Sequence, residues 1–167
     1  MVDLGIYIES IGDALPELAV SNKKLSEEFP DWDFKHLEER TGVAQRHIVT
    51  HGETALDLSI SACKKLVESK NLDLDQIDGL IFCTQTPDYL IPSNACLLHG
   101  RLNLPTSVFS LDINMGCSGF VYGLEVARGL IGTGTTRKIL FATADTYSNH
   151  INLKDRATRV LFGDGAA

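Results

Sequence analysis

The sequence lacks any long apolar run. No stretch approaches the roughly 20 consecutive apolar residues that a membrane-spanning helix needs. The first residues, MVDLGIYIES, also lack the basic start, apolar core and small-residue cleavage site of a secretion signal. We therefore expect a cytoplasmic protein that has no membrane partner.

Basic residues and cysteines are also scarce. Lys and Arg number 15 against 22 Asp and Glu, which gives a net charge of −7, whereas non-specific nucleic-acid binding needs a basic surface. The 4 cysteines are widely separated and never show the Cys-x-x-Cys spacing of zinc or redox sites. We expect no nucleic-acid partner, no metal and reduced thiols.

Several common catalytic motifs are missing as well. Neither Gly-x-Gly-x-x-Gly nor Gly-x-x-x-x-Gly-Lys occurs, and these are the glycine-rich loops that bind dinucleotides and nucleotide phosphates. Ser118 stands directly beside Gly119, so the segment GCSG does not have the Gly-x-Ser-x-Gly spacing of serine hydrolases. These absences argue against nucleotide-binding and serine-hydrolase folds.

Strand and helix patterns alternate along most of the 167 residues. Continuous apolar runs such as GLIFC and KILFA are typical of strands covered on both faces. The pattern predicts one α/β domain with a mainly parallel sheet covered by helices. The predicted strands are 5–12, 45–49, 79–86, 107–113, 138–144 and one that begins at 159–163, and the predicted helices are 22–29, 32–42, 54–71, 92–102 and 117–132.

A cysteine stands at one of the strand-to-helix junctions. In LDINMGCSGFVYGL, Cys117 follows a predicted strand and falls near the first turn of a predicted helix. Unpaired backbone amides and the positive end of the helix dipole gather there. They favour a thiolate and could hold a developing oxyanion. The neighbouring residues Gly116, Gly119 and Gly123 would let a backbone or a ligand approach closely.

A structural role is the alternative for this cysteine, because free cysteine often serves as a small buried apolar residue. From its position alone, Cys117 is as well explained by one role as by the other. Cys63 on a helix flank, Cys83 in mid-strand and Cys96 are expected to be structural.

Four segments together resemble one family: LDINMGCSGFVYGL, RTGVAQRHIV, QTPDYLIPSNACLL and DRATRVLFGDGAA. In order and spacing they are similar to β-ketoacyl-acyl-carrier-protein synthase III, of the thiolase superfamily. The resemblance implies that residues 1–167 are an N-terminal half-domain with a five-stranded mixed sheet and helices. The C-terminal half would be absent, in agreement with a sequence that stops at VLFGDGAA, where a strand unit begins.

The resemblance also implies roles for individual residues. Cys117 matches the nucleophile, while Arg40 and Arg156 match arginines that hold the nucleotide end of coenzyme A. Ile91 matches a position that reaches the acyl pocket of a neighbouring subunit, and Phe162 matches a wall of that pocket. The family often has tryptophan four residues before the first arginine, where this sequence has His36.

The implied reaction loads an acyl group from acyl-CoA onto Cys117 and condenses it with malonyl-acyl carrier protein, with loss of carbon dioxide. This is a step of fatty acid biosynthesis, carried out by a homodimer with a coenzyme A thioester as substrate and no bound cofactor. The catalytic histidine and asparagine would lie in the absent half, so this chain alone would at most be acylated. The alternatives are a thiolase-fold acyltransferase or synthase of secondary metabolism and a non-catalytic interaction module.

Overall fold

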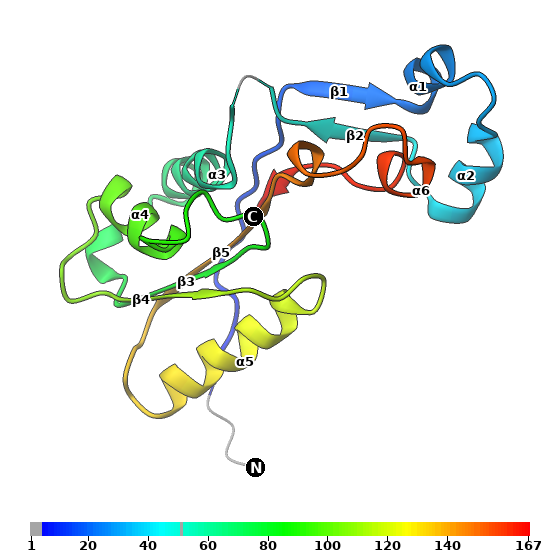
Figure 1. The fold of residues 1–167 in the computed structure, drawn as a ribbon. Helices are drawn as coiled ribbons and strands as arrows, with labels where there is room; N and C mark the ends of the chain where they lie inside the picture. Colours follow the sequence, from blue (N-terminus) through cyan, green and yellow to red (C-terminus); the bar gives the residue numbers. More distant parts are fainter. Residues whose placement is uncertain (1–4, 51) are drawn as a thin grey trace.

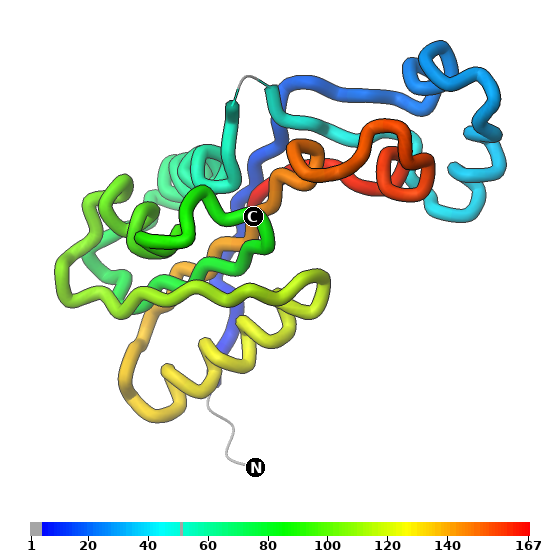
Figure 2. Tube along the Cα trace, viewed as in Figure 1, coloured from blue at the N-terminus to red at the C-terminus, as the bar shows by residue number. Residues whose placement is uncertain are grey.

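The computed structural model describes residues 5–50 and 52–167 (Figure 1). A larger α/β region is built on one sheet, and a smaller region lies at one end of the molecule (Figure 2). The strands are β1 (Leu18–Ser21), β2 (Gln45–Ile48), β3 (Gly79–Cys83), β4 (Phe109–Ile113), β5 (Ile139–Asp145) and β6 (Gly165–Ala166). The helices are α1 (Asn22–Glu28), α2 (Phe34–Thr41), α3 (Ala55–Lys70), α4 (Asn94–Arg101), α5 (Gly119–Gly132) and α6 (Arg156–Arg159), with 3₁₀ turns η1 (Leu74–Gln76) and η2 (Tyr147–Asn149).

The main sheet has the strand order β4-β3-β5-β6. Strand β3 pairs in parallel with both β4 and β5, and β6 runs antiparallel to β5. The predicted mixed, mainly parallel sheet is therefore confirmed. The predicted count of five strands is wrong, because the described residues form a four-stranded sheet and a separate two-stranded sheet, β1-β2.

The first predicted strand does not form. Residues 5–12, all of them described, form no strand, and the first pairing beyond them is a bridge between Ala14 and Ala166. Apolar alternation shows which face of a segment is apolar, but a strand also needs a neighbouring edge to accept its hydrogen bonds. Tyr7 in this segment is 79% exposed, and no described strand pairs with residues 5–12.

The prediction of a strand that begins at 159–163 is also wrong. The Asp155 side chain accepts from the amides of Ala157 and Thr158 and so starts α6. The carbonyl of Thr158 then accepts from Leu161 N and Phe162 N, which turns the chain instead of extending it. The strand begins only at β6, and β1 was not predicted at all.

Most helix ends lie close to where the sequence predicts them. Thr54 and Asp57 form a reciprocal capping box at the start of α3, and Asn71 ends it in the left-handed conformation. Ser21 caps α1, and Gly42 with φ 72° ends α2. These local signals set the boundaries without reference to the rest of the fold.

Helices cover both faces of the main sheet. Helices α3 and α4 pack on one face and α5 on the other (Figure 1). The larger core joins α3 and α4 to the buried side chains of β3, such as Leu80 and Phe82. On α5 only Gly119 and Gly123 are fully buried. Phe120, Val121 and Tyr122 are exposed, although the ring of Phe120 also stacks on Phe141 of β5.

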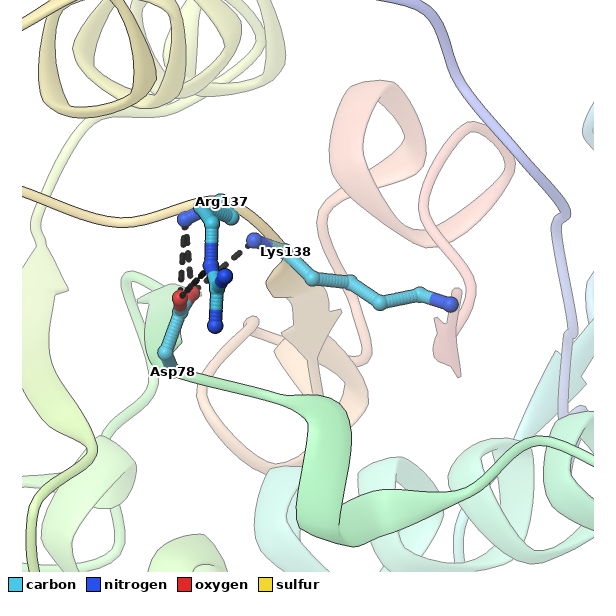
Figure 3. A network of polar contacts seen from close by, with 3 residues as sticks. All are labelled: Asp78, Arg137 and Lys138. Atoms are coloured by element: carbon cyan, nitrogen blue, oxygen red, sulfur yellow. Dashed lines mark hydrogen bonds and ion pairs between the residues drawn. The ribbon is translucent and has the colours of Figure 1, made fainter. Parts of the chain in front are cut away.

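An aspartate joins the starts of two neighbouring strands. Asp78, just before β3, accepts from the backbone amides of Arg137 and Lys138 at 2.9 Å, and the Arg137 guanidinium lies 3.8 Å from its carboxylate (Figure 3). The Lys138 side chain points away and forms an ion pair with Glu9 at 2.8 Å. This network fixes the register of β5 against β3.

The smaller region has its own core of Val20, Leu25, Phe34 and Val160. Buried Arg46 connects its parts, because its guanidinium donates to Val20 O at 3.1 Å and to Val160 O at 3.0 Å. The two-stranded sheet, α2 and the end of α6 therefore form one packed unit.

Candidate active site

Cys117 lies in the turn between β4 and α5, two residues before the helix begins at Gly119. Its side chain is exposed. Gly119 N donates to Gly116 O at 2.7 Å and closes the turn around the cysteine. Ser118, the N-cap residue, makes no side-chain cap bond in the described part of the chain. The position predicted for Cys117 at the start of a helix is confirmed, and its side chain is not sealed in the core.

Two glycines let α5 approach the sheet closely. A Cβ atom at Gly119 would lie 2.2 Å from Cys83 Sγ, and one at Gly123 would lie 2.1 Å from the ring of Phe141. No side chain fits at these distances, so both positions require glycine. The sequence shows the glycines, whereas their partners on β3 and β5 emerge only from the fold.

The carboxyl ends of β3 and β5 meet beside this turn. Asp145 Oδ1, at the end of β5, accepts from the side chains of Thr84 and Thr86 at 3.1 Å each. It also accepts from Gln85 N at 2.7 Å and Thr86 N at 3.0 Å. One carboxylate oxygen thus holds the loop that follows β3. Sequence reasoning missed this cluster, although ligand sites often lie at the carboxyl ends of parallel strands.

Tyr147 lies next to the same turn. Its hydroxyl donates to Gln85 Oε1, and its ring stacks on Phe162 with centroids 5.2 Å apart. Burial, followed by the electrostatic influence of the nearby Asp145 and Cys117 side chains, raises the pKa of Tyr147. The phenol therefore stays protonated at neutral pH and acts as a donor. Sequence reasoning assigned no role to Tyr147 or Gln85.

The other three cysteines differ in exposure. Cys63 and Cys83 are buried, as a structural role requires, but Cys96 on α4 is exposed. Burial raises the pKa of Cys63 to about 11 and also raises the pKa of Cys83. Both buried thiols are therefore poor nucleophiles at neutral pH. Cys96 and Cys117 are the accessible ones.

The two predicted arginines lie on the smaller region. Arg40 is in the last turn of α2 and Arg156 is the first residue of α6, and both are exposed. Phe34 of α2 and Val160, directly after α6, belong to the same core, and both helices lie at one end of the molecule (Figures 1 and 2). His36, at the position where the family often has tryptophan, is exposed. The one tryptophan of the sequence, Trp32, stacks instead on Phe29, with the ring centroids 4.1 Å apart.

The two predicted pocket residues lie in different surroundings. The ring of Phe162 stacks on Tyr147 with centroids 5.2 Å apart. Ile91 is 88% exposed in the loop before α4. The pocket role of Phe162 and the role of Ile91 toward a second subunit both stay predictions.

Among residues 5–50 and 52–167, no group of three or more His, Cys, Asp or Glu side chains is arranged to hold a metal. In the same ranges, no helix combines the length and the apolar character needed to cross a bilayer.

Known proteins match both the sequence and the fold. The family model of 3-oxoacyl-[acyl-carrier-protein] synthase III matches residues 111–167. A β-ketoacyl-[acyl-carrier-protein] synthase III from Oleidesulfovibrio alaskensis is 38% identical over 160 residues, which is 96% of this chain and 48% of the relative. Over almost its whole length, the chain is similar in sequence and fold to synthase III proteins.

Solved structures of synthase III enzymes superpose closely. A 3-oxoacyl-(acyl-carrier-protein) synthase III is 45% identical with a TM-score of 0.91, covering 95% of this chain and 47% of that one. The enzyme from Thermus thermophilus is 34% identical with a TM-score of 0.88, covering 95% and 49%. The chain spans about half the length of the synthase III proteins it matches.

Proposed function

We propose that this chain is the cysteine-bearing, N-terminal half of a β-ketoacyl-acyl-carrier-protein synthase III of fatty acid biosynthesis. The observation that carries the proposal is the position of Cys117, exposed in a glycine-bounded turn at the start of α5. The similarity to synthase III enzymes along almost the whole chain supports it. That similarity favours synthase III over a secondary-metabolism enzyme or a non-catalytic module.

The first step is an acyl transfer. The Cys117 thiolate attacks the thioester carbonyl of acyl-CoA, and amides at the start of α5 stabilise the tetrahedral oxyanion. The carbon–sulfur bond to coenzyme A then breaks, coenzyme A leaves as a thiolate that takes up a proton from water, and the acyl group remains on Cys117. Arg40 and Arg156 would bind the phosphates of coenzyme A through their guanidinium groups.

The second step needs the other half of the enzyme. Malonyl-acyl carrier protein loses carbon dioxide, and the resulting carbanion attacks the acyl carbonyl and releases Cys117. The product is a 3-oxoacyl chain on the carrier protein. The histidine and asparagine that drive decarboxylation would come from the second half, so this chain alone would be self-acylated at most.

The exposed apolar side chains of α5 support the proposal of a second half. A helix that is apolar on both sides is typical of burial on both sides, and Phe120, Val121 and Tyr122 are 48%, 67% and 55% exposed. We propose that a C-terminal half covers this face. We also propose a cytoplasmic homodimer in which Ile91 reaches the partner's acyl pocket and Phe162 lines its own.

Acylation of the chain tests the proposed function. Incubation with acetyl-CoA, followed by peptide mass spectrometry, should place one acyl group on Cys117 and none on Cys96, the other exposed cysteine. Cys117→Ala should abolish the modification, whereas Cys96→Ala, the matched control, should leave it unchanged. Arg40→Ala and Arg156→Ala should each raise the acetyl-CoA concentration needed for half-maximal loading by about tenfold. Equal acylation of both exposed cysteines would contradict the proposal.

A further inference from the structure

We propose that Gln85 and Tyr147 form a hydrogen-bonded pair that positions the turn carrying Cys117. The inference deepens the proposed function and rests on Cys117 being its nucleophile. The two residues follow β3 and β5, which are neighbours in the main sheet, so the fold places them together although 62 positions separate them. They act through the turn and are positioning residues.

Gln85 contacts the residue that precedes the cysteine. A Cβ atom at Gly116 would lie 2.9 Å from Gln85 Oε1 and 3.3 Å from its Cδ, so the carboxamide occupies the space that a side chain would take. The backbone of Gln85 is fixed in turn, because its amide donates to Asp145 Oδ1 at 2.7 Å. The Gln85 side chain therefore packs against the turn, and its backbone is held in place by Asp145.

Tyr147 holds the carboxamide in that place. Its hydroxyl donates to Gln85 Oε1, and stacking on Phe162 at 5.2 Å limits the motion of its ring. The pair thus borders the turn at Gly116, the residue directly before Cys117.

Positioning matters because this turn is rich in glycine. Glycine samples more backbone conformations than any other residue, so an unsupported Gly116–Cys117 segment would lose the alignment of its amides. Aligned amides stabilise a thiolate and an oxyanion only when their geometry is fixed before reaction. Loss of the pair should therefore slow the reaction of Cys117 while the fold stays intact.

Alkylation kinetics test the inference. Tyr147→Phe removes the hydroxyl and keeps the ring stacked on Phe162, and Gln85→Met keeps the length of the side chain and removes the acceptor. Tyr7→Phe, at a residue 79% exposed, is the control. The rate of iodoacetamide reaction at Cys117 is followed from about pH 6 to about pH 10 by peptide mass spectrometry.

At pH 7, each single variant should react at Cys117 about threefold or more slowly. The double variant should be no slower than the slower single variant, because either change breaks the same contact. Tyr7→Phe should match the parent. Either single variant suffices as a test if the other fails to fold.

An unchanged Cys117 profile in a folded variant would overturn the inference, even if thermal stability falls, because lost stability alone indicates only a structural role. Additive effects of the two changes would overturn it as well. A parent protein in which Cys117 reacts no faster than Cys96 would overturn the nucleophile assignment itself and the inference with it. If instead Cys117 of the parent reacts faster than Cys96 and the variants react like the parent, only the inference about Gln85 and Tyr147 is overturned.

Discussion

Replacing Gly119 with alanine should push α5 away from the sheet. The added Cβ would lie 2.2 Å from Cys83 Sγ and 3.3 Å from Met115 Cβ. Cys83 is only 6% exposed, and its thiol donates to Met115 O at 3.3 Å, so the sulfur has little room to move. The helix start, and with it the turn at Cys117, must shift instead.

The structure also indicates the size of this effect. Forcing an extra methyl group into a packed core costs about 1 to 3 kcal/mol, while alanine gains up to about 1 kcal/mol over glycine within a helix. With the full alanine gain, the expected net loss for Gly119→Ala is therefore about 0 to 2 kcal/mol of unfolding free energy. Cys83→Ala removes the sulfur and leaves Cys83 Cβ 3.9 Å from the new methyl group, an ordinary contact distance.

A double-mutant cycle separates this clash from other causes. Urea unfolding of the parent, Gly119→Ala, Cys83→Ala and the double variant should show a favourable coupling of about 1 to 2 kcal/mol. Gly129→Ala is the control on the same helix, because no described atom lies within 4 Å of its new Cβ, and it should stabilise by about 1 kcal/mol. Strictly additive losses at Gly119 and Cys83 would refute the reasoning.

Three further changes have defined outcomes in urea unfolding. Burial raises the pKa of Cys63 from 9.0 to about 11, so as the pH rises this thiol ionises first in the unfolded chain. The free energy of unfolding is therefore unaffected by this group below about pH 9 and is lower by about 1.4 kcal/mol at about pH 10. Cys63→Ala should remove this alkaline loss relative to the parent. Asp164→Ala leaves the buried amide of Val49 and the partly buried amide of Ser148 without their acceptor and should cost about 3 kcal/mol, whereas an unchanged midpoint would refute that role. Asp145→Asn keeps an acceptor oxygen but removes the charge, and should cost about 1 to 2 kcal/mol.

Local signals explain the parts of the fold that the sequence predicted. The Thr54–Asp57 capping box and Asn71 bound α3 because a helix end depends on residues within a few positions of it. The five apolar residues 79–83 predicted a doubly covered strand, and all five are buried in β3. The parallel pairing with β4 and β5 follows from the helices that connect these strands.

Pairing partners explain the parts that the sequence did not predict. Residues 5–12 alternate like a strand, but their hydrogen bonds would need an edge that local pattern cannot name. The segment 159–163 has a β-like composition, yet Asp155 caps a short helix just before it. In both cases a longer-range or competing interaction decided the backbone conformation.

The candidate site likewise combines a residue that local sequence identifies with residues that only the fold brings together. Cys117 could be singled out because a cysteine at a strand-to-helix junction is a local feature. Gln85, Asp145 and Tyr147 are ordinary residues in the sequence and become neighbours only when β3 and β5 pair in parallel. Parallel strands bring their carboxyl ends to one edge, so polar residues just after each predicted strand were the signal available.

The close approach of Gly119 and Gly123 to the sheet affects both the packing of α5 and the position of the turn that carries Cys117. Alanine would be the better helix former at Gly119 and Gly123, but either methyl group would lift the helix from Cys83 or Phe141. The amides that open α5 would then move relative to the Gln85–Tyr147 pair, which is anchored on the sheet through Asp145. Stabilising the isolated helix would therefore misalign the turn at Cys117, and this explains why poor helix formers stand at the two positions nearest the sheet.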